Sequence, residues 1–423
     1  MQKIKTQEEW IERAKSVLPA AGFGNFDPNV ILKKGKGSRV WDEDGNEFLD
    51  LLIGSGPMLL GHGHPEVQEV IIEQLTDGLT FFTNNAAGIE LAEVICKAVP
   101  CAEQVRYLTS GSEADMYAIR LARAYTGRPK ILKFEGGYHG MSAEAQMSLA
   151  PTKRVNYPMA VPDSGGIPAS VPADMLIAPF NDKRFLESII NEHGHEIAGV
   201  IVEPLQRLIP PVPGFLQSLR DLCTKTGIVL IFDEIVTGFR LAYGGAQEAY
   251  DVKPDLCTLG KVIGGGFALA ALAGKSEIMA CFDKEAVTQE RWLMQLGTLA
   301  GSPVAACAGL KTLEVLSREG SYDRLRENGE RLMKLNIQAL DSAGIPHQIV
   351  GEPALFDVVF SERPVTNYRE HQDENSARNK KFNDILRNNG VLKAPNKVYT
   401  SLALTEDDFS LMEASLQKAS NAL

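Results

Sequence analysis

Apolar and polar positions near the start of the chain follow first a helical period and then a strand-like period. Thr6 and Glu9 form a capping box at the start of residues 6–18. Apolar side chains then recur at helical spacing, at Trp10, Ile11, Ala14 and Leu18. Residues 39–50 place two strand-like runs on either side of residues 44–46, Asp-Gly-Asn, a typical turn sequence. The pattern therefore predicts an amphipathic helix followed by a β-hairpin.

From about residue 65 to 310 the pattern becomes an alternation of strands and helices. Helical periodicity marks Pro65–Leu75, Ile89–Val99 and Glu113–Tyr125. Strand-like runs cover Gln104–Leu108, Lys130–Phe134, Gly199–Val202 and Ile228–Phe232. Short apolar strands of this kind are typical of a buried, mostly parallel sheet. Residues 150–173 lack periodicity, and a long irregular segment inside a compact domain is usually functional or mobile.

The rest of the pattern predicts how the chain divides into domains. Further helical stretches are Thr312–Leu316, Tyr322–Ala343 and one that begins at Thr405. A chain of 423 residues is expected to form two or three structural units, at roughly 100–200 residues each. We expect a large domain at 51–310 and a small domain at 311–423, with residues 1–50 packed against the small domain. The predicted fold class is α/β, with a mostly parallel central sheet and a smaller α+β domain.

Composition narrows the class of protein. The hydrophobic fraction of 44% is near the globular average, and the formal net charge of −11 argues against a generic nucleic-acid binder. Six cysteines without a C-x-x-C pair indicate reduced thiols rather than a disulfide framework or a zinc ribbon. The start of the chain does not resemble a signal peptide, and no run reaches about 18 apolar residues. We therefore expect a soluble, cytoplasmic protein without a membrane span.

Standard motifs of several enzyme classes are absent from the sequence. It has no G-x-G-x-x-G, G-x-x-x-x-G-K-[ST], H-E-x-x-H or G-x-S-x-G. This absence weakens dinucleotide, nucleoside-triphosphate, zinc-protease and serine-hydrolase functions without excluding any of them. What remains is a series of four loops, each at the end of a predicted strand.

The first loop is Thr109–Ala114, between a predicted strand and a predicted helix. Its small hydroxyl side chains and Gly111 would offer backbone N–H groups to an anion at a helix start, where the helix dipole adds attraction. An ordinary Ser cap followed by Glu113 in the first turn explains the same residues equally well. Phosphate binding and simple capping both remain open for this loop.

The second loop, Gly136–Gly140, follows the predicted strand Lys130–Phe134. Its glycines allow a close backbone approach, and Tyr138 and His139 offer flat faces to an aromatic cofactor. The simpler alternative is a glycine turn with two half-exposed rings. The loop alone does not decide between them.

The third loop begins where five apolar residues, 228–232, run into Asp233 and Glu234. Acids at the carboxyl end of a buried strand lie where open α/β sheets bind ligands. A carboxylate there can keep a heterocyclic nitrogen protonated, because the negative charge stabilises the cation. A helix cap is the alternative role for Asp233.

The fourth loop places Lys261 directly after a predicted strand, between Gly260 and the glycines at 264–266. A lysine in that position is poorly placed to serve as a solubilising surface residue. Lysine forms Schiff bases with carbonyls once burial or a nearby cation lowers its pKa. The alternative is a phosphate-binding lysine without covalent chemistry.

Together the four loops supply an anion-binding turn, a stacking ring, a carboxylate and a reactive amine. Pyridoxal 5'-phosphate needs a phosphate anchor, a ring contact, a partner for its pyridinium nitrogen and a Schiff-base lysine. The combination is far more specific for this cofactor than any single loop.

The motifs in this order resemble those of class III pyridoxal-phosphate aminotransferases, in particular the branch of glutamate-1-semialdehyde aminomutase and related ω- and β-aminotransferases. The resemblance covers roughly residues 10–405. It rests on GSEA (111–114), GGYHG (136–140), VEP (202–204), FDEIVTGFR (232–240), LGKVIGGG (259–266) and GTLAGSPVAACAG (297–309). It implies the type I pyridoxal-phosphate transferase fold.

The resemblance also implies roles for individual residues. Lys261 would be the Schiff-base lysine, Asp233 would pair with the pyridinium nitrogen, and Tyr138 would cover the cofactor ring. The phosphate would be held by Ser110, Gly111 and Ser112. His139 and Glu203 lie near the site in the family.

Two further segments acquire an interpretation from the resemblance. Thr298 would reach the phosphate in the neighbouring subunit, which implies a homodimer with its sites at the subunit interface. Residues 162–174 resemble the mobile gating loop of the aminomutase branch.

The sequence departs from the aminomutase branch at two places near the expected substrate. Ser55 takes the position of a tryptophan, which should enlarge the pocket and favours a bulky amine or a β-amino acid. The stretch 394–403 lacks the glutamate that the branch carries near its C-terminus. Arg240 is a candidate for contact with a substrate carboxylate, but a structural salt bridge is favoured.

We therefore predict a pyridoxal-phosphate-dependent aminotransferase that acts on a small-molecule amino donor and a carbonyl acceptor. Lys261 would move the proton as general base and acid. The alternative is glutamate-1-semialdehyde 2,1-aminomutase, which returns the nitrogen to the same carbon skeleton. A catalytically silent, regulatory cofactor-binding protein is opposed by the presence of both Lys261 and Asp233.

Overall fold

The computed structural model describes residues 6–372 and 376–423 and divides the chain into two compact units. Unit 1 contains the described residues of Met1–Pro65, Asp323–Glu362 and Glu374–Leu423. Unit 2 contains those of Glu66–Tyr322 and Arg363–Asp373. The C-terminal part of the chain therefore contributes a short segment to unit 2 before it returns to unit 1.

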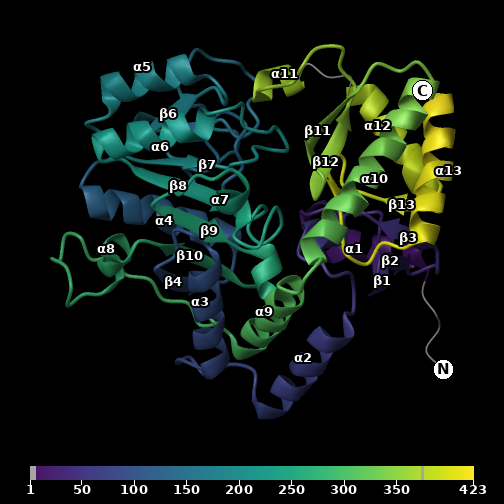
Figure 1. Cartoon of the computed structure of the whole chain (residues 1–423), viewed down its shortest axis with the longest axis horizontal. Coiled ribbons are helices and arrows are strands. Elements are labelled where there is room, and N and C mark those ends of the chain that lie inside the picture. The colour runs from purple at the N-terminus through teal and green to yellow at the C-terminus, as the bar shows by residue number, and fades with distance from the viewer. Residues whose placement is uncertain (1–5, 373–375) are drawn as a thin grey trace. The chain divides into compact units, whose positions relative to one another are not determined.

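Unit 2 is built on a seven-stranded sheet with the strand order β4-β10-β9-β8-β7-β5-β6 (Figure 1). Its strands are β4 (Gln104–Leu108), β5 (Lys130–Phe134), β6 (Met175–Ala178), β7 (Ile197–Val202), β8 (Val229–Glu234), β9 (Leu256–Leu259) and β10 (Ala270–Gly274). Only β10 runs antiparallel to its neighbours, so the predicted mostly parallel sheet and the α/β class are confirmed. The sequence pattern missed β10, because its short run of small residues lacks the branched side chains typical of strands.

Helices cover both faces of this sheet, as an α/β layer requires. The helices of unit 2 are α2 (Pro65–Asp77), α3 (Ala86–Ala98), α4 (Gly111–Thr126), α5 (Lys183–His193), α6 (Phe215–Thr226), α7 (Gly245–Ala249), α8 (Ser276–Met279), α9 (Pro303–Leu316) and α11 (Tyr368–Gln372). α4 packs against β7 to β10, whereas α5 and α6 pack against each other on the opposite side of the sheet (Figure 1). The apolar residues between sheet and helices form the core of the unit.

Unit 1 combines two small sheets with four longer helices. One sheet has the order β1 (Leu32–Lys36), β2 (Arg39–Asp42), β3 (Glu47–Asp50) and β13 (Val391–Leu392), and the other has the order β11 (Gln348–Glu352), β12 (Leu355–Val359) and β14 (Val398–Tyr399). The helices are α1 (Gln7–Val17), most of α10 (Ser321–Ser342), α12 (Ser376–Asn388) and α13 (Glu406–Ala422). β13 pairs in parallel with β3, so the N-terminal and C-terminal segments share one sheet.

The capping signals in the sequence place several element ends correctly. Thr6 caps α1 and Thr405 caps α13, each in a capping box. The hairpin of β2 and β3 also forms where it was predicted. The predicted helix Thr312–Leu316 is only the end of α9, which begins with Pro303 at its first position, where proline needs no hydrogen-bonded N–H. Among the described residues, no helix is long and apolar enough to cross a bilayer.

Candidate active site

Asp233 lies near the end of β8, buried at the carboxyl edge of the sheet in unit 2. Its Oδ2 lies 2.8 Å from Nδ1 of His139, and its Oδ1 accepts a hydrogen bond of 3.1 Å from the backbone N–H of Ile235. Turns follow β8, and α7 does not begin until Gly245, so the alternative role of Asp233 as a helix cap is wrong. The carboxylate is thus oriented by two neighbours and faces the edge where parallel sheets bind ligands.

Lys261 follows the neighbouring strand β9 after one glycine. β8 and β9 are in register, with Asp233 opposite Thr258, so both loops leave the same edge of the sheet. The backbone of Lys261 has a φ of +48°, a left-handed conformation that costs a non-glycine residue about 1–3 kcal/mol. Such strain is kept where the surrounding structure requires a particular side-chain position, which makes Lys261 a functional candidate on structural grounds.

The start of α4 completes the same edge. The Ser110 side chain caps the helix by accepting from the backbone N–H of Glu113, and the Glu113 side chain accepts from the backbone N–H of Ser110. The simple capping role is therefore present. The helix start still offers backbone N–H groups and a positive dipole end, so it can also attract an anion.

Three close approaches bring the four predicted loops together. A β-carbon at Gly140 would lie 2.5 Å from the Cα of Ser112, which only glycine allows. A β-carbon at Gly111 and one at Gly260 would each lie 3.1 Å from the side chain of Ile235. The second loop therefore touches the first, and Ile235 of the third loop separates the first from the fourth.

Tyr138 and His139 occupy different environments within the second loop. The Tyr138 side chain is half-exposed, and its backbone N–H donates a 2.8 Å hydrogen bond to Oε2 of Glu203, which follows β7. His139 is fully buried, so the alternative of two half-exposed rings is wrong for this residue. Its Nε2 is buried without a hydrogen-bond partner, an unsatisfied polar atom inside the site.

A second buried acid, which the sequence analysis missed, stands beside Asp233. Asp115 on α4 accepts a 2.7 Å hydrogen bond from Oγ1 of Thr258, which also lies 3.4 Å from Oδ1 of Asp233. Burial, and after it the negative charge of Asp233, raises the pKa of the Asp115 carboxyl well above its ordinary value. The Asp115 carboxyl therefore keeps its proton to a higher pH than an exposed aspartic acid does.

We expect Asp115→Asn to make the free energy of unfolding less dependent on pH. The folded wild type keeps the Asp115 proton at pH values where the unfolded chain, with an ordinary pKa of 3.8, has lost it. The free energy of unfolding therefore falls as the pH rises through this range, and the amide cannot contribute to that fall. Urea unfolding at about pH 5 and about pH 7.5 should show the wild type losing at least about 1 kcal/mol more than the variant. Equal losses would contradict a protonated Asp115.

α11, in the short C-terminal segment of unit 2, is hydrogen-bonded to Glu135 at the start of the loop that carries Tyr138. Arg369 on α11 makes two hydrogen bonds of 2.7 and 2.9 Å to the buried carboxylate of Glu135. The Tyr157 hydroxyl donates a 2.6 Å hydrogen bond to the same carboxylate. Tyr157 lies in the irregular stretch at 150–173, so this stretch is tied to the site loop through Glu135.

Two of the predicted residues lie outside the converging loops. Thr298 is exposed on the segment that precedes α9, together with the apolar side chains of Leu296 and Leu299. Arg240 is completely buried, and its Nε donates a 2.9 Å hydrogen bond to the carbonyl of Val236. This burial agrees with the structural role that was favoured for Arg240.

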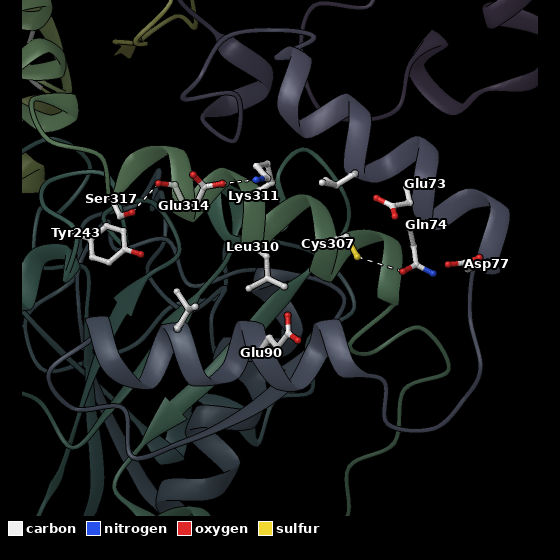
Figure 2. Close-up of a pocket in the computed structure, with 12 residues that line it drawn as sticks. Glu73, Gln74, Asp77, Glu90, Tyr243, Cys307, Leu310, Lys311, Glu314 and Ser317 are labelled. Carbon is white, nitrogen blue, oxygen red and sulfur yellow. Dashed lines mark hydrogen bonds and ion pairs between the residues drawn. The ribbon is translucent and has the colours of Figure 1, made fainter.

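Unit 2 also contains a separate cavity of about 570 Å³, whose lining offers few groups suited to catalysis (Figure 2). It lies between α2, α3 and α9 and contains none of the predicted site residues. Its only lysine, Lys311, is paired with Glu314, and Cys307 lies 3.4 Å from the side-chain oxygen of Gln74. The lining contains acids but no histidine, and it offers no buried acid–histidine pair like that of Asp233 and His139, so the carboxyl edge of the sheet is the candidate active site.

Comparisons with known proteins show the family of this chain. Residues 23–419 match the family model described as aminotransferase class-III. The chain is 38% identical over 412 residues to a glutamate-1-semialdehyde 2,1-aminomutase of Natranaerobius thermophilus, covering 96% of this chain and 93% of the relative.

Two solved structures are also similar to this chain. One is an omega-transaminase from Sphaerobacter thermophilus, with a TM-score of 0.91, 34% identity and coverage of 99% and 98% of the two chains. The other is a beta-phenylalanine aminotransferase from Variovorax paradoxus, with a TM-score of 0.85, 30% identity and coverage of 97% and 93%.

Proposed function

This chain belongs to the aminotransferase class-III family, and from that premise we propose that it moves an amino group between an amine or amino acid and a keto acid or aldehyde. It is a pyridoxal 5'-phosphate-dependent enzyme with the type I transferase fold of that family. The observation that carries the proposal is the meeting of Asp233, His139, Lys261 and the start of α4 at one edge of the sheet.

The residues at this edge fit the cofactor's functional groups. We propose that Ser110, Gly111 and Ser112 hold the phosphate at the start of α4, where N–H groups and the helix dipole favour an anion. Tyr138, half-exposed beside them, would cover the ring. Asp233 would face the ring nitrogen, where a carboxylate stabilises the protonated ring.

When bound, the cofactor supplies an electron sink for the substrate's reacting carbon. The protein's own residues bind the cofactor, position its neighbours and move the proton. Lys261 would hold the cofactor through its amine and would carry the proton of the substrate carbon as general base and acid. Asp233 would place its carboxylate next to the ring nitrogen, and Asp115, whose pKa burial raises, lies beside it on Thr258. His139 holds Asp233 in position at 2.8 Å. Glu203 fixes the backbone of the Tyr138 loop.

The experiment that tests the function measures transfer between separate molecules. Purified holoprotein is mixed with a panel of amino donors and with pyruvate or 2-oxoglutarate, and the new amino acid is quantified together with the cofactor's visible absorption. Formation of alanine or glutamate from a donor amine supports the aminotransferase. No transfer to any keto acid with any donor would refute it.

The second candidate is glutamate-1-semialdehyde 2,1-aminomutase, favoured by the 38% identity to the aminomutase of Natranaerobius thermophilus. It would use the same residues and return the nitrogen to the same skeleton. Ser55 in place of tryptophan, and the missing acid at 394–403, favour transfer instead. Turnover of glutamate-1-semialdehyde without transfer to a keto acid would identify the aminomutase.

We further propose a homodimer in which Thr298 reaches the partner's phosphate site. Thr298 is exposed within a segment whose apolar side chains are also exposed, Leu296 by 70%. Leu296→Asp should therefore shift the protein from dimer to monomer in sedimentation and weaken cofactor retention, because a charge would replace apolar contact. Dimers that persist with unchanged cofactor retention would contradict this role of the segment.

All six cysteines are free, which supports a cytoplasmic location.

A further inference from the structure

Arg207 sits at the tip of a tight turn just beyond β7. The backbone N–H of Gln206 donates 3.0 Å to the carbonyl of Ile209, and the N–H of Ile209 donates 2.8 Å to the carbonyl of Gln206. Arg207 and Leu208 between them have φ values of +52° and +85°. Glycine and asparagine form such turns with less strain, so the turn itself does not call for an arginine.

The turn is fixed to the loop that carries Tyr138. The buried side chain of Gln206 donates a 2.8 Å hydrogen bond to the carbonyl of Glu135. Four residues before Arg207, Glu203 accepts the hydrogen bond from the backbone N–H of Tyr138. The position of Arg207 relative to this loop is therefore well defined.

The guanidinium group of Arg207 lies beside the ring that we propose to cover the cofactor. Its central carbon is 5.8 Å from the centre of the Tyr138 ring, and the arginine is half-buried. Burial raises the pKa of Tyr138, and the positive charge of Arg207 acts against that shift. The charge is thus close enough to act on groups at the site.

Arg207 lacks an internal carboxylate partner. Within residues 6–372 and 376–423, no acidic side chain forms an ion pair with its guanidinium. Arg369, also in unit 2, differs from Arg207 because it makes two hydrogen bonds to the buried Glu135. A fixed, half-buried arginine beside a reaction site can accept a carboxylate from a ligand through its planar fork of N–H donors.

We propose that Arg207 binds the carboxylate of the substrate and makes this enzyme selective for amino acids over simple amines. The inference rests on the proposed function, in which the substrate amine meets the cofactor next to Tyr138. It assigns specificity to a turn residue on the loop after β7 and leaves Arg240 as a structural residue.

The test compares donors that differ only in the carboxylate. 3-Amino-3-phenylpropanoate is paired with 1-phenylpropan-1-amine, and alanine with isopropylamine, so that a methyl group replaces the acid in each pair. Arg207→Gly removes the guanidinium and suits the left-handed backbone, so folding should be kept or improved. We expect kcat/KM to fall about 10- to 100-fold for the acids and to change less than about threefold for the amines, because a charge-assisted bond is lost only with the acids.

Two further variants separate charge from geometry. Arg207→Lys keeps the charge without the fork and should lose part of the preference. Arg184→Gln, an exposed arginine on α5 of the same unit, should leave the ratio between acid and amine unchanged.

The possible failures are distinguishable. Equal loss with both members of each pair, or no loss with the acids, overturns the role of Arg207 while the transfer activity stands. A wild-type protein that transfers nitrogen from no donor of either kind overturns the proposed function itself. Thermal unfolding of Arg207→Gly at or above the wild-type temperature shows that any loss of preference is not a loss of folding.

Discussion

Lys261→Ala is expected to abolish amino transfer in a protein that still folds and still binds the cofactor phosphate. Lys261 is the residue that we propose both to hold the cofactor and to carry the proton, so one substitution removes both steps. General acid–base catalysis alone contributes about 10²- to 10⁴-fold, and the loss should therefore reach at least about 10³-fold. The measurement is the rate of alanine formation from a donor that the wild type uses, at matched cofactor content.

Two controls define what the loss means. Lys253→Ala removes an exposed lysine from the approach to the same strand, β9, and should leave both rate and spectrum as in the wild type. Borohydride should attach the cofactor to the peptide with residue 261 in the wild type and in Lys253→Ala, and not in Lys261→Ala. A small amine such as methylamine should restore part of the rate in Lys261→Ala, because it can replace the missing base. Unchanged turnover in Lys261→Ala would remove the catalytic assignment.

The strained backbone at Lys261 allows a second measurement, the free energy of unfolding, which is independent of the transfer rate. Its φ of +48° is unfavourable for lysine and alanine alike, so Lys261→Ala keeps the strain. Lys261→Gly relieves it and should raise the free energy of unfolding by up to about 1–3 kcal/mol above that of Lys261→Ala. A gain in stability together with lost transfer would show that the strain is maintained for function.

The sequence predicted the composition of this site because each of its loops follows a strand. The residues at Ser110, Tyr138, Asp233 and Lys261 all come directly after apolar runs, and the carboxyl ends of parallel strands share one edge. The antiparallel β10 does not disturb this rule. β4 and β9 each pair antiparallel with β10, so β4 runs in the same direction as β5, β7, β8 and β9. Pattern and motif together therefore predict which residues lie at this edge, and the roles assigned to them stay predictions.

The contacts that tune the site were not predictable in the same way. Asp115 interrupts an apolar helix face that includes Ala114, Ala118 and Ile119, which is a signal for a buried acid. Its pairing with Thr258 depends on how α4 crosses β9, and no sequence period encodes that crossing. Similarly, Arg369 and Glu135 are 234 residues apart, and only the folded chain shows that α11 braces the site loop.

Lys133 is a buried charged residue within a strand, which a hydrophobic pattern does not predict. It lies inside β5 and is fully buried, with its ammonium donating 2.7 Å hydrogen bonds to the carbonyls of Ala145 and Met147. Desolvation lowers the pKa of Lys133 to about 7, and two carbonyl acceptors partly replace the lost water. Its hydrogen-bond acceptors are backbone carbonyls 12 and 14 residues further along the chain, which any residue type can supply, so the sequence alone gives no reason for its burial.

Asp233→Asn is expected to have the second largest effect on the rate of amino transfer. The rate should fall about 10²- to 10³-fold, which is the loss expected when one preorganised electrostatic contact is removed from an active site. The amide has nearly the same shape and can still accept the 3.1 Å bond from the N–H of Ile235, so the fold should persist. What is lost is the negative charge that stabilises a protonated ring nitrogen. The rate of the half-reaction with a donor amine measures this loss.

The spectrum separates this electrostatic role from a structural one. If Asp233 supplies the charge, the bound cofactor in Asp233→Asn should lose its ring proton at a lower pH than in the wild type. Asp233→Glu keeps the charge and should recover part of both rate and spectrum. Transfer in Asp233→Asn within about threefold of the wild type would contradict the assignment, since an electrostatic contact of this kind is worth far more.

The neighbouring acid makes the strongest comparison, because Asp115 and Asp233 both contact Thr258 and burial raises the pKa of Asp115 well above its ordinary value. Asp115→Asn replaces a neutral acid with a neutral amide, so its transfer rate should fall by less than about tenfold, whereas the same change at Asp233 removes a charge. A larger loss at Asp115 than at Asp233 would reverse the assignment of the proton within the pair. Because the two variants change similar atoms in one buried network, a difference between them measures charge and not packing.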